Sequence, residues 1–166
     1  MKKLNDLVLS ITVAIIDFIY RDLPIQRFWV LETIARAPYF AFLSVLHLRE
    51  SLGLRTEEHY YLMKEHFAQS VNETEHLKEM ERRGGADRWI DRVFAYHLVL
   101  VYYWSMVIYY FIDPVSAYHL NSEIEFHATE TYLDYLWDHP EDTKIGEIAA
   151  DEMNHYIELS RDMEMV

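Results

Sequence analysis

Two Glu-x-x-His pairs, Glu73 with His76 and Glu152 with His155, have the spacing in this sequence that most directly suggests chemistry. In a helix, this spacing places a carboxylate and an imidazole one turn apart on the same face, so both can bind one metal ion. The chain contains no Cys, which excludes thiolate-bound zinc, iron–sulfur clusters and a cysteine nucleophile. Carboxylate and imidazole ligands without sulfur suit iron or manganese, and open coordination positions on such ions suit oxygen chemistry.

Two further glutamates complete a possible set of ligands. Glu32 and Glu73 are almost equally far along the chain from Gly53, where a turn is predicted. Glu125 and Glu152 are almost equally far from a second predicted turn, at His139 and Pro140. In an antiparallel helical hairpin, such pairs lie at the same height, because each helical residue rises about 1.5 Å. Each predicted hairpin therefore offers one Glu and one Glu-x-x-His at one level, as in ferritin-like bundles that bind two metal ions.

The charge of this arrangement also predicts metal. Four carboxylates inside a bundle repel one another and lose their hydration unless they gain protons or cations. Two divalent ions would balance them, with iron or manganese both compatible with the ligands. Helical phase alone leaves open whether Glu125 or one of its neighbours, Glu123 and Glu130, faces the ions.

The elements that must position these residues are six predicted helices, and no stretch alternates well enough to predict a strand. We predict N-terminal caps at Asp22, Thr56, Asp87, Asp113 and either Asp142 or Thr143, and a bend at Pro38. The fold expected is all-α: a ferritin-like four-helix bundle of the second, third, fifth and sixth helices, with two additional apolar helices, in one domain, residues 1–166. The predicted helices are residues 3–21, 24–51, 57–83, 87–112, 114–138 and 143–166.

The first and fourth helices are unusually apolar. Between residues 93 and 112, His97 and Ser105 are the two polar interruptions, and five Tyr and one Trp are present. Such aromatic side chains favour the headgroup region of a bilayer, where their polar tips stay hydrated. We expect both helices to insert into one leaflet rather than to cross the membrane. The alternative is that they are core helices of a soluble bundle.

Composition excludes a further class of partner. The net charge is −13, with 15 Lys and Arg against 28 Asp and Glu, so the chain does not supply the basic face that nucleic acids require. The first residues show neither a secretory nor an organelle-targeting pattern, and we expect the sequence to start close to the folded domain.

Four ordered motifs of this sequence resemble those of the alternative oxidase family of membrane-bound di-iron quinol oxidases, in particular its plastid terminal oxidase branch. The similarity extends from about residue 15 to Tyr132 and resumes at Ala150. The motifs are LETIARAPYFAFLSVL (residues 31–46), NETEHL (72–77), AYHLNSEIEFHATETY (117–132) and ADEMNHY (150–156).

The resemblance assigns roles to particular residues. It implies that Glu125, rather than Glu123 or Glu130, is a ligand, and that Tyr132 is a catalytic tyrosine near the irons. Asn72 and Asp151 would hold ligands through hydrogen bonds, and His47 would lie at a dimer contact. The implied quinol pocket residues are Arg27, Leu31, Ala128 and Thr131, and the implied iron ligands are Glu32, Glu73, His76, Glu125, Glu152 and His155.

Two features depart from the family pattern. Ala149 occupies a position, three residues before the last ligand Glu, where relatives usually carry Arg or another polar residue. Only 18 residues separate Tyr132 from Asp151, where relatives have a long insertion. The last hairpin is therefore expected to be compact.

The resemblance implies a quinol oxidase that uses two iron ions per chain to reduce O2 to water with electrons from plastoquinol or ubiquinol, without pumping protons. A homodimer bound to one leaflet of a thylakoid or bacterial cytoplasmic membrane would be expected. Two alternatives share parts of the pattern. One is a soluble ferritin-like protein for iron storage or peroxide detoxification, and the other is a non-enzymatic helical bundle that interacts with membranes.

Overall fold

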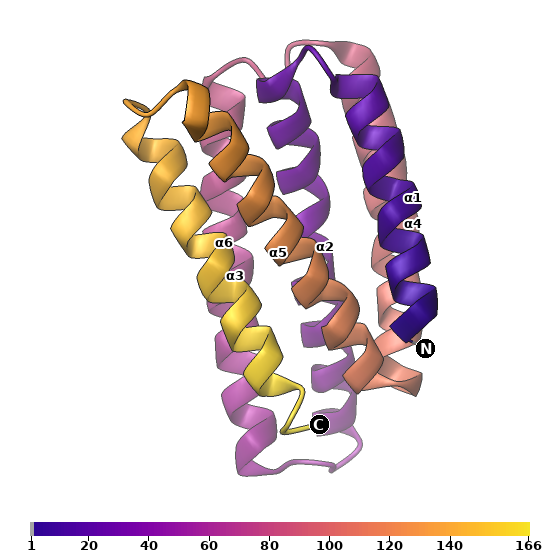
Figure 1. Ribbon diagram of the computed structural model, residues 1–166. Coiled ribbons are helices and arrows are strands. Elements are labelled where there is room, and N and C mark those ends of the chain that lie inside the picture. The colour runs from indigo at the N-terminus through magenta and orange to yellow at the C-terminus, as the bar shows by residue number, and fades with distance from the viewer. Residues whose placement is uncertain (1) are drawn as a thin grey trace.

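The computed structural model describes residues 2–166, which form six helices and no strand. This confirms the all-α prediction. The helices, labelled in Figure 1, are α1 (Lys2–Tyr20), α2 (Pro24–Ser51), α3 (Glu57–Arg82), α4 (Trp89–Ile112), α5 (Pro114–Asp138) and α6 (Thr143–Asp162).

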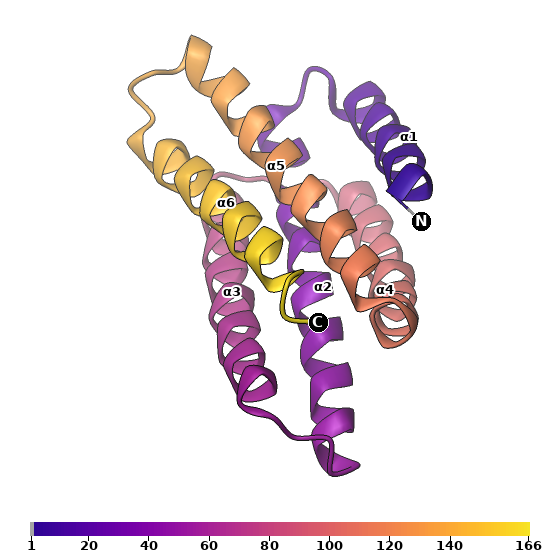
Figure 2. The same cartoon turned by 60° about the horizontal axis from the view of Figure 1, so that its bottom comes forward.

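Two helical hairpins build the bundle. Helix α2 packs against α3, α5 packs against α6, and the two hairpins meet through α2 with α5 and α3 with α6. Figures 1 and 2 show α1 and α4 beside this bundle, on the side away from α3 and α6. Helix α4 packs mainly on α2, and α1 packs mainly on α5. The prediction of a four-helix bundle with two additional apolar helices is therefore confirmed.

Three of the predicted helix caps are confirmed. The Thr56 side chain accepts a hydrogen bond from the His59 amide at the start of α3. The Asp113 side chain accepts one from Ser116, and Asp142 accepts one from Ile145, so both aspartates satisfy amides that have no partner within their helices.

The caps predicted at Asp22 and Asp87 are wrong. Leu23 is the residue before α2, and no side chain caps this helix; Pro24 lies in its first turn and leaves one amide fewer to satisfy. Asp87 belongs instead to the preceding turn, where its amide donates to Gly84 O at 3.2 Å, and α4 begins after Arg88. Helix α6 also ends earlier than predicted, at Asp162 rather than at the C-terminus. Pro38 lies buried inside α2, and its bend stays a prediction.

Two aromatic-rich core clusters pack the interior. One contains Phe28, Trp29 and Tyr132, and the other contains Tyr39, Phe42 and Tyr118 with their aliphatic neighbours. Along α2, Glu32 lies between Trp29 of the first cluster and Tyr39 of the second. The candidate ligands are therefore held at the junction of two apolar layers, where their positions are fixed by close packing.

Gly85 fits the α3–α4 turn tightly against α2. A Cβ at this position would lie 2.5 Å from the Trp29 Cβ and 3.0 Å from the Ile25 carbonyl oxygen. We expect Gly85→Ala to destabilise the metal-free protein by about 1–3 kcal/mol, measured by thermal unfolding, because neither neighbour is a flexible side-chain end. Gly146→Ala is the control: its nearest neighbouring atom is 4.0 Å away, so unfolding at wild-type or higher temperature is expected. Equal melting temperatures for both variants would contradict the tight fit.

Helices α1 and α4 expose much of their apolar surface. Among residues 2–166, α2 and α4 are long and apolar enough to cross a membrane, but 67% of the most apolar window of α2 is buried, against 17% for α4. Helix α2 is thus the central helix of the bundle, whereas α4 presents an unburied apolar face. The exposed residues include Leu7, Ile11, Ile15 and Phe18 on α1, and Leu100, Val101, Trp104, Ile108 and Phe111 on α4.

Candidate metal centre

The structure brings all six predicted ligands together in the middle of the bundle. Each of the four glutamates and two histidines is buried, with at most 5% of its surface exposed. Their ligand atoms form two groups, and within each group all atoms lie within 4.8 Å of one another. The first group is Glu32, Glu73, His76 and Glu152, and the second is Glu73, Glu125, Glu152 and His155.

Glu73 and Glu152 belong to both groups. Glu32 and His76 complete one group, and Glu125 and His155 complete the other. Each hairpin supplies one shared glutamate, because Glu73 lies on α3 and Glu152 on α6. Two ions bound here would therefore share two carboxylates and have one further Glu and one His each.

The two Glu-x-x-His pairs approach each other across the bundle. His76 Nδ1 lies 3.0 Å from Glu152 Oε1, and His155 Nδ1 lies 2.8 Å from Glu73 Oε1. Each imidazole therefore faces the shared carboxylate of the other hairpin. This arrangement follows from the helical spacing of three residues, which places Glu and His of one motif on the same face.

The electrostatics of the six residues fit divalent cations. Burial is the largest cause that raises the pKa of Glu32, Glu73 and Glu152 well above the ordinary value, and repulsion from neighbouring carboxylates raises it further. Each of the four glutamates also has at least one buried oxygen without a hydrogen-bond partner. Unpaired buried oxygens of this kind are costly unless a cation binds them. The residues present thus fit two divalent ions.

Two buried tyrosines donate hydrogen bonds to the unshared glutamates. The Tyr132 hydroxyl donates to Glu32, and the Tyr39 hydroxyl donates to Glu125 Oε1 at 2.7 Å. Burial raises the pKa of both phenols well above the ordinary value, so both remain donors at neutral pH. Tyr39 was not among the predicted site residues. Its position seven residues after Glu32, on the same face of α2, is the signal that identifies it.

Asn72 and Asp151 lie at the outer edge of the centre. His76 Nε2 is 3.2 Å from Asp151 Oδ2, and Asn72 Nδ2 donates to the same oxygen at 3.4 Å. Asp151 can therefore fix the tautomer and orientation of the His76 ring, with Nδ1 left facing the carboxylates. The side chain of Asp151 is 42% exposed, so the contact also connects His76 to solvent.

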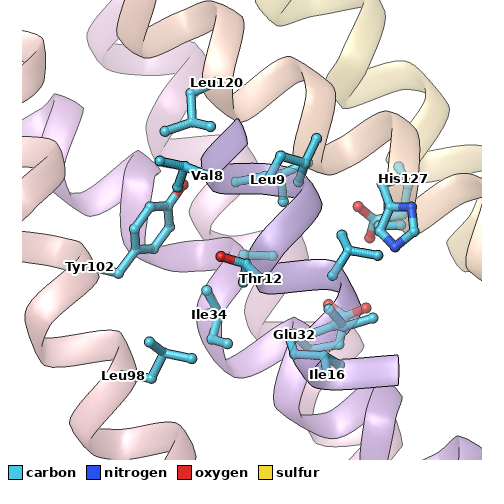
Figure 3. A pocket seen from close by; sticks show the side chains of 16 residues that line it. Val8, Leu9, Thr12, Ile16, Glu32, Ile34, Leu98, Tyr102, Leu120 and His127 are labelled. Atoms are coloured by element: carbon cyan, nitrogen blue, oxygen red, sulfur yellow. The ribbon is translucent and has the colours of Figure 1, made fainter. Parts of the chain in front are cut away.

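An apolar cavity of about 110 Å³ leads to the centre from the side of α1 and α4. Figure 3 shows Val8, Leu9 and Thr12 of α1 on one wall and Leu98 and Tyr102 of α4 on another, with Glu32 at the end. Of the predicted pocket residues, Leu31 and Ala128 line this cavity. Tyr102 and His127 also line it and were not predicted, because no single helix carries a pattern for a cavity bordered by five helices.

Arg27 and Thr131 are not among the residues that line the cavity. They contact each other beside it: Arg27 Nη2 donates to Thr131 Oγ1 at 3.3 Å. Arg27 also forms an ion pair with Asp17 of α1 at 2.6 Å. These three polar residues tie α1 to the ends of α2 and α5 next to the apolar wall.

The remaining predicted positions lie away from the two groups. Glu123 and Glu130 belong to neither, and Glu130 is exposed. The His47 side chain is 75% exposed and lies 3.9 Å from Glu50. Ala149 is buried in the first core cluster, where a methyl group packs in place of the polar residue usual in the family.

Comparison with known proteins agrees with these observations. The alternative oxidase family matches residues 8–165. Ubiquinol oxidase 4, chloroplastic/chromoplastic, of Arabidopsis thaliana is 48% identical over 124 residues, which cover 75% of this chain and 35% of that protein. The chain thus spans about a third of the length of this curated relative, and no solved structure matches. The match over nearly the whole chain shows that it belongs to the alternative oxidase family.

Proposed function

We propose that this protein is a membrane-associated quinol oxidase that couples the oxidation of two quinols to the four-electron reduction of O2 to two waters, without pumping protons. The observation that carries the proposal is the connection between the two carboxylate and histidine groups and an apolar cavity that starts at the exposed face of α1 and α4. A lipid-soluble quinol and O2 both suit such a cavity, whereas a soluble substrate does not need it.

Iron is the metal we propose, with Glu32, Glu73, His76, Glu125, Glu152 and His155 as its ligands. The ligand types also accept manganese. Bound iron would supply the electron transfer and oxygen binding that side chains cannot perform. The shared Glu73 and Glu152 would hold both ions, and the apolar residues of the cavity would exclude bulk water from that side.

Residues around the cavity would position the quinol. Leu31 and Ala128 form part of its apolar wall, beside Glu32 and Glu152, which belong to both the cavity and the ligand set. A quinol head group in this cavity would therefore lie next to the metal centre. We propose that Arg27 and Thr131, bonded to each other nearby, help to hold the polar end of the head group.

Tyr132 is proposed to relay an electron and a proton during O2 reduction. Its hydroxyl donates to Glu32, and its ring packs on Phe28 with a centroid distance of 4.5 Å. We expect Tyr132→Phe to keep bound iron but to reduce quinol oxidation by about 100-fold or more, because the phenol proton is lost. Iron content and oxygen uptake are measured on the same preparation. Tyr135→Phe, which removes a half-buried hydroxyl away from the ligands, is the matched control, and equal activity of the two variants would contradict the role.

We propose that α1 and α4 insert into one leaflet of a thylakoid or bacterial cytoplasmic membrane. The two helices lie on the same side of the bundle and carry exposed apolar residues, and the aromatic side chains of α4 suit the interface. We expect Leu100→Glu to weaken binding to lipid vesicles at least about tenfold, measured by flotation, because a charge there must enter the acyl region. Leu100 is 58% exposed, so the fold should remain intact.

The control for this prediction is Val71→Glu on α3. Val71 is 45% exposed and belongs to α3, a helix on the side of the bundle away from α1 and α4 (Figure 1). Its replacement adds the same charge but is expected to leave vesicle binding unchanged. Equal loss of binding in both variants would show that net charge, rather than the α1 and α4 face, controls membrane association.

Residues 1–166 are proposed to form a single domain, which assembles as a homodimer with the exposed His47 at the contact. Sedimentation in detergent tests this assembly, with His47→Glu expected to shift the protein toward the monomer.

The activity is tested by oxygen uptake. Iron-loaded protein in vesicles is supplied with a reduced quinol, and O2 consumption that is insensitive to cyanide is expected, with two quinols oxidised per O2. No uptake by protein that holds two irons per chain would contradict the oxidase. Hydrogen peroxide consumption without quinol oxidation would instead favour a peroxide-detoxifying protein.

A further inference from the structure

A polar groove lies between α3 and α6, on the side of the bundle away from the apolar cavity. Figure 2 shows these two helices beside each other and opposite α1 and α4. The groove has a volume of about 230 Å³. Its polar lining consists of carboxylates, carboxamides and one of the candidate ligands, His155.

The groove reaches the metal centre directly. His155 lines it and is 5% exposed, and its Nδ1 has no hydrogen-bond partner, although it lies 2.8 Å from Glu73 Oε1. The Oδ1 atom of Asn72, another lining residue, is also buried without a partner. A donor nitrogen and a carboxamide oxygen therefore lie unsatisfied between solvent and the shared Glu73. Hydrated cations exchange water for donors of this kind.

The charge of the groove is negative. Glu65, Asp151 and Glu158 line it, and no Lys or Arg does so within residues 2–166. Asp151 and Glu158 carry most of this charge, because Arg161 pairs with Glu65 and burial raises the pKa of Glu65 to about 7. A negatively charged groove with low-dielectric walls concentrates cations and increases their rate of association.

The neighbouring depression along the same two helices has a different charge. It also contains Asn72, Asp151 and the candidate ligand His76, so it too reaches the centre, but Lys78, Arg82 and Lys144 line it as well. These three cations offset its carboxylates. The apolar cavity on the other side offers a hydrated cation almost no polar contact before Glu32, so a cation would lose its hydration there without compensation.

We propose that the groove beside His155 is the path by which divalent cations pass from water to the metal centre. The inference rests on the proposed metal centre. A cation would be attracted by Asp151 and Glu158, exchange water for the Asn72 oxygen and the His155 nitrogen, and then bind the shared Glu73 and Glu152. Cations and quinol would thus reach the same centre from opposite sides of the bundle.

The test measures how fast Co²⁺ binds to the metal-free protein, followed by its visible absorption after mixing. Glu158→Gln and Asn154→Lys each make the groove more positive by one charge, and Asn154 is exposed, so the second variant preserves the Gln69–Glu158 hydrogen bond. We expect either variant to slow Co²⁺ uptake by about three- to tenfold at low ionic strength. The difference should shrink at about 1 M salt, because screening shortens electrostatic steering.

Glu141→Gln is the matched control. It changes the net charge equally, but Glu141 is exposed at the α5–α6 turn and does not line the groove. Uptake at the wild-type rate is expected. Final Co²⁺ content and helical circular dichroism should equal those of the wild type in all three variants, which shows that the variants fold and that the ligands are intact.

Three results would overturn the inference. The first is wild-type uptake in both groove variants at full final occupancy, and the second is equal slowing by Glu141→Gln. The third is loss of Co²⁺ uptake when lipid vesicles cover the α1 and α4 face, which would place the path on the apolar side. Failure of the wild-type protein to bind two ions per chain would overturn the proposed metal centre as well, so the two failures are distinguishable.

Discussion

Replacing Glu152 with Ala is expected to remove both metal ions, whereas Glu32→Ala is expected to remove one. Glu152 belongs to both ligand groups, and Glu32 belongs to the first alone. Loss of a shared carboxylate therefore deprives each of the two ions of a ligand. Glu73→Ala should resemble Glu152→Ala, and Glu125→Ala should resemble Glu32→Ala, for the same reason.

The measurement is metal content per chain after iron loading and removal of excess ions, with oxygen uptake on the same samples. We expect quinol oxidation to fall below about 1% of wild type in all four variants, since each lacks a complete pair of ions. Glu130→Ala is the control, because Glu130 lies on α5 but is exposed and outside both groups. Equal metal content in the Glu152 and Glu32 variants would contradict the shared position of Glu152.

Removal of the metal is expected to make the stability of the protein depend on pH in an unusual direction. The folded-state pKa of Glu32, Glu73 and Glu152 is raised, mainly by burial, so the folded metal-free protein retains protons that the unfolded chain releases. The free energy of unfolding of the metal-free protein is therefore highest below the ordinary carboxylate pKa. It decreases as the pH rises toward the raised folded-state pKa values. Each retained proton contributes a slope of about 1.4 kcal/mol per pH unit.

Thermal unfolding of the metal-free and metal-loaded forms at pH 5 and pH 8 measures this effect. We expect the metal-free protein to unfold at a lower temperature at pH 8 than at pH 5. The metal-loaded protein should lose much less stability between these pH values, because the cations bind the ionised carboxylates and stabilise the folded form by mass action. Glu152→Gln should reduce the pH dependence of the metal-free form. Parallel pH profiles of the loaded and metal-free forms would contradict the expectation.

Much of the centre is predictable from the sequence because it depends on local helical geometry. The Glu-x-x-His spacing places Glu73 beside His76 whatever surrounds the helix. Equal distance from a turn sets Glu32 level with Glu73, once the two helices form a hairpin. The position of the three glutamates around helix α5 does not distinguish Glu125 from Glu123 and Glu130, so the choice of Glu125 depends on the family resemblance.

Other features depend on contacts between elements that are distant in the sequence. Asp22 and Asp87 have the side chain of a cap, but the start of α2 is set by Pro24 and that of α4 by the turn from Gly84. The cavity requires the mutual placement of α1, α2, α4, α5 and α6. The spacing from Glu32 places Tyr39 on the inner face of α2, but its partner Glu125 belongs to the other hairpin and is not set by that spacing.

The two buried tyrosines form reciprocal hydrogen bonds between the two hairpins of the bundle. Tyr39 of α2 donates to Glu125 of α5, and Tyr132 of α5 donates to Glu32 of α2. The two metal subsites therefore have the same ligand types and each has one phenol partner. Their surroundings differ, because the apolar cavity borders Glu32 and the polar groove borders His155. Inequivalence between two bound ions would therefore originate in the surroundings, since Asp151 contacts His76 whereas the groove borders His155, rather than in the ligand types.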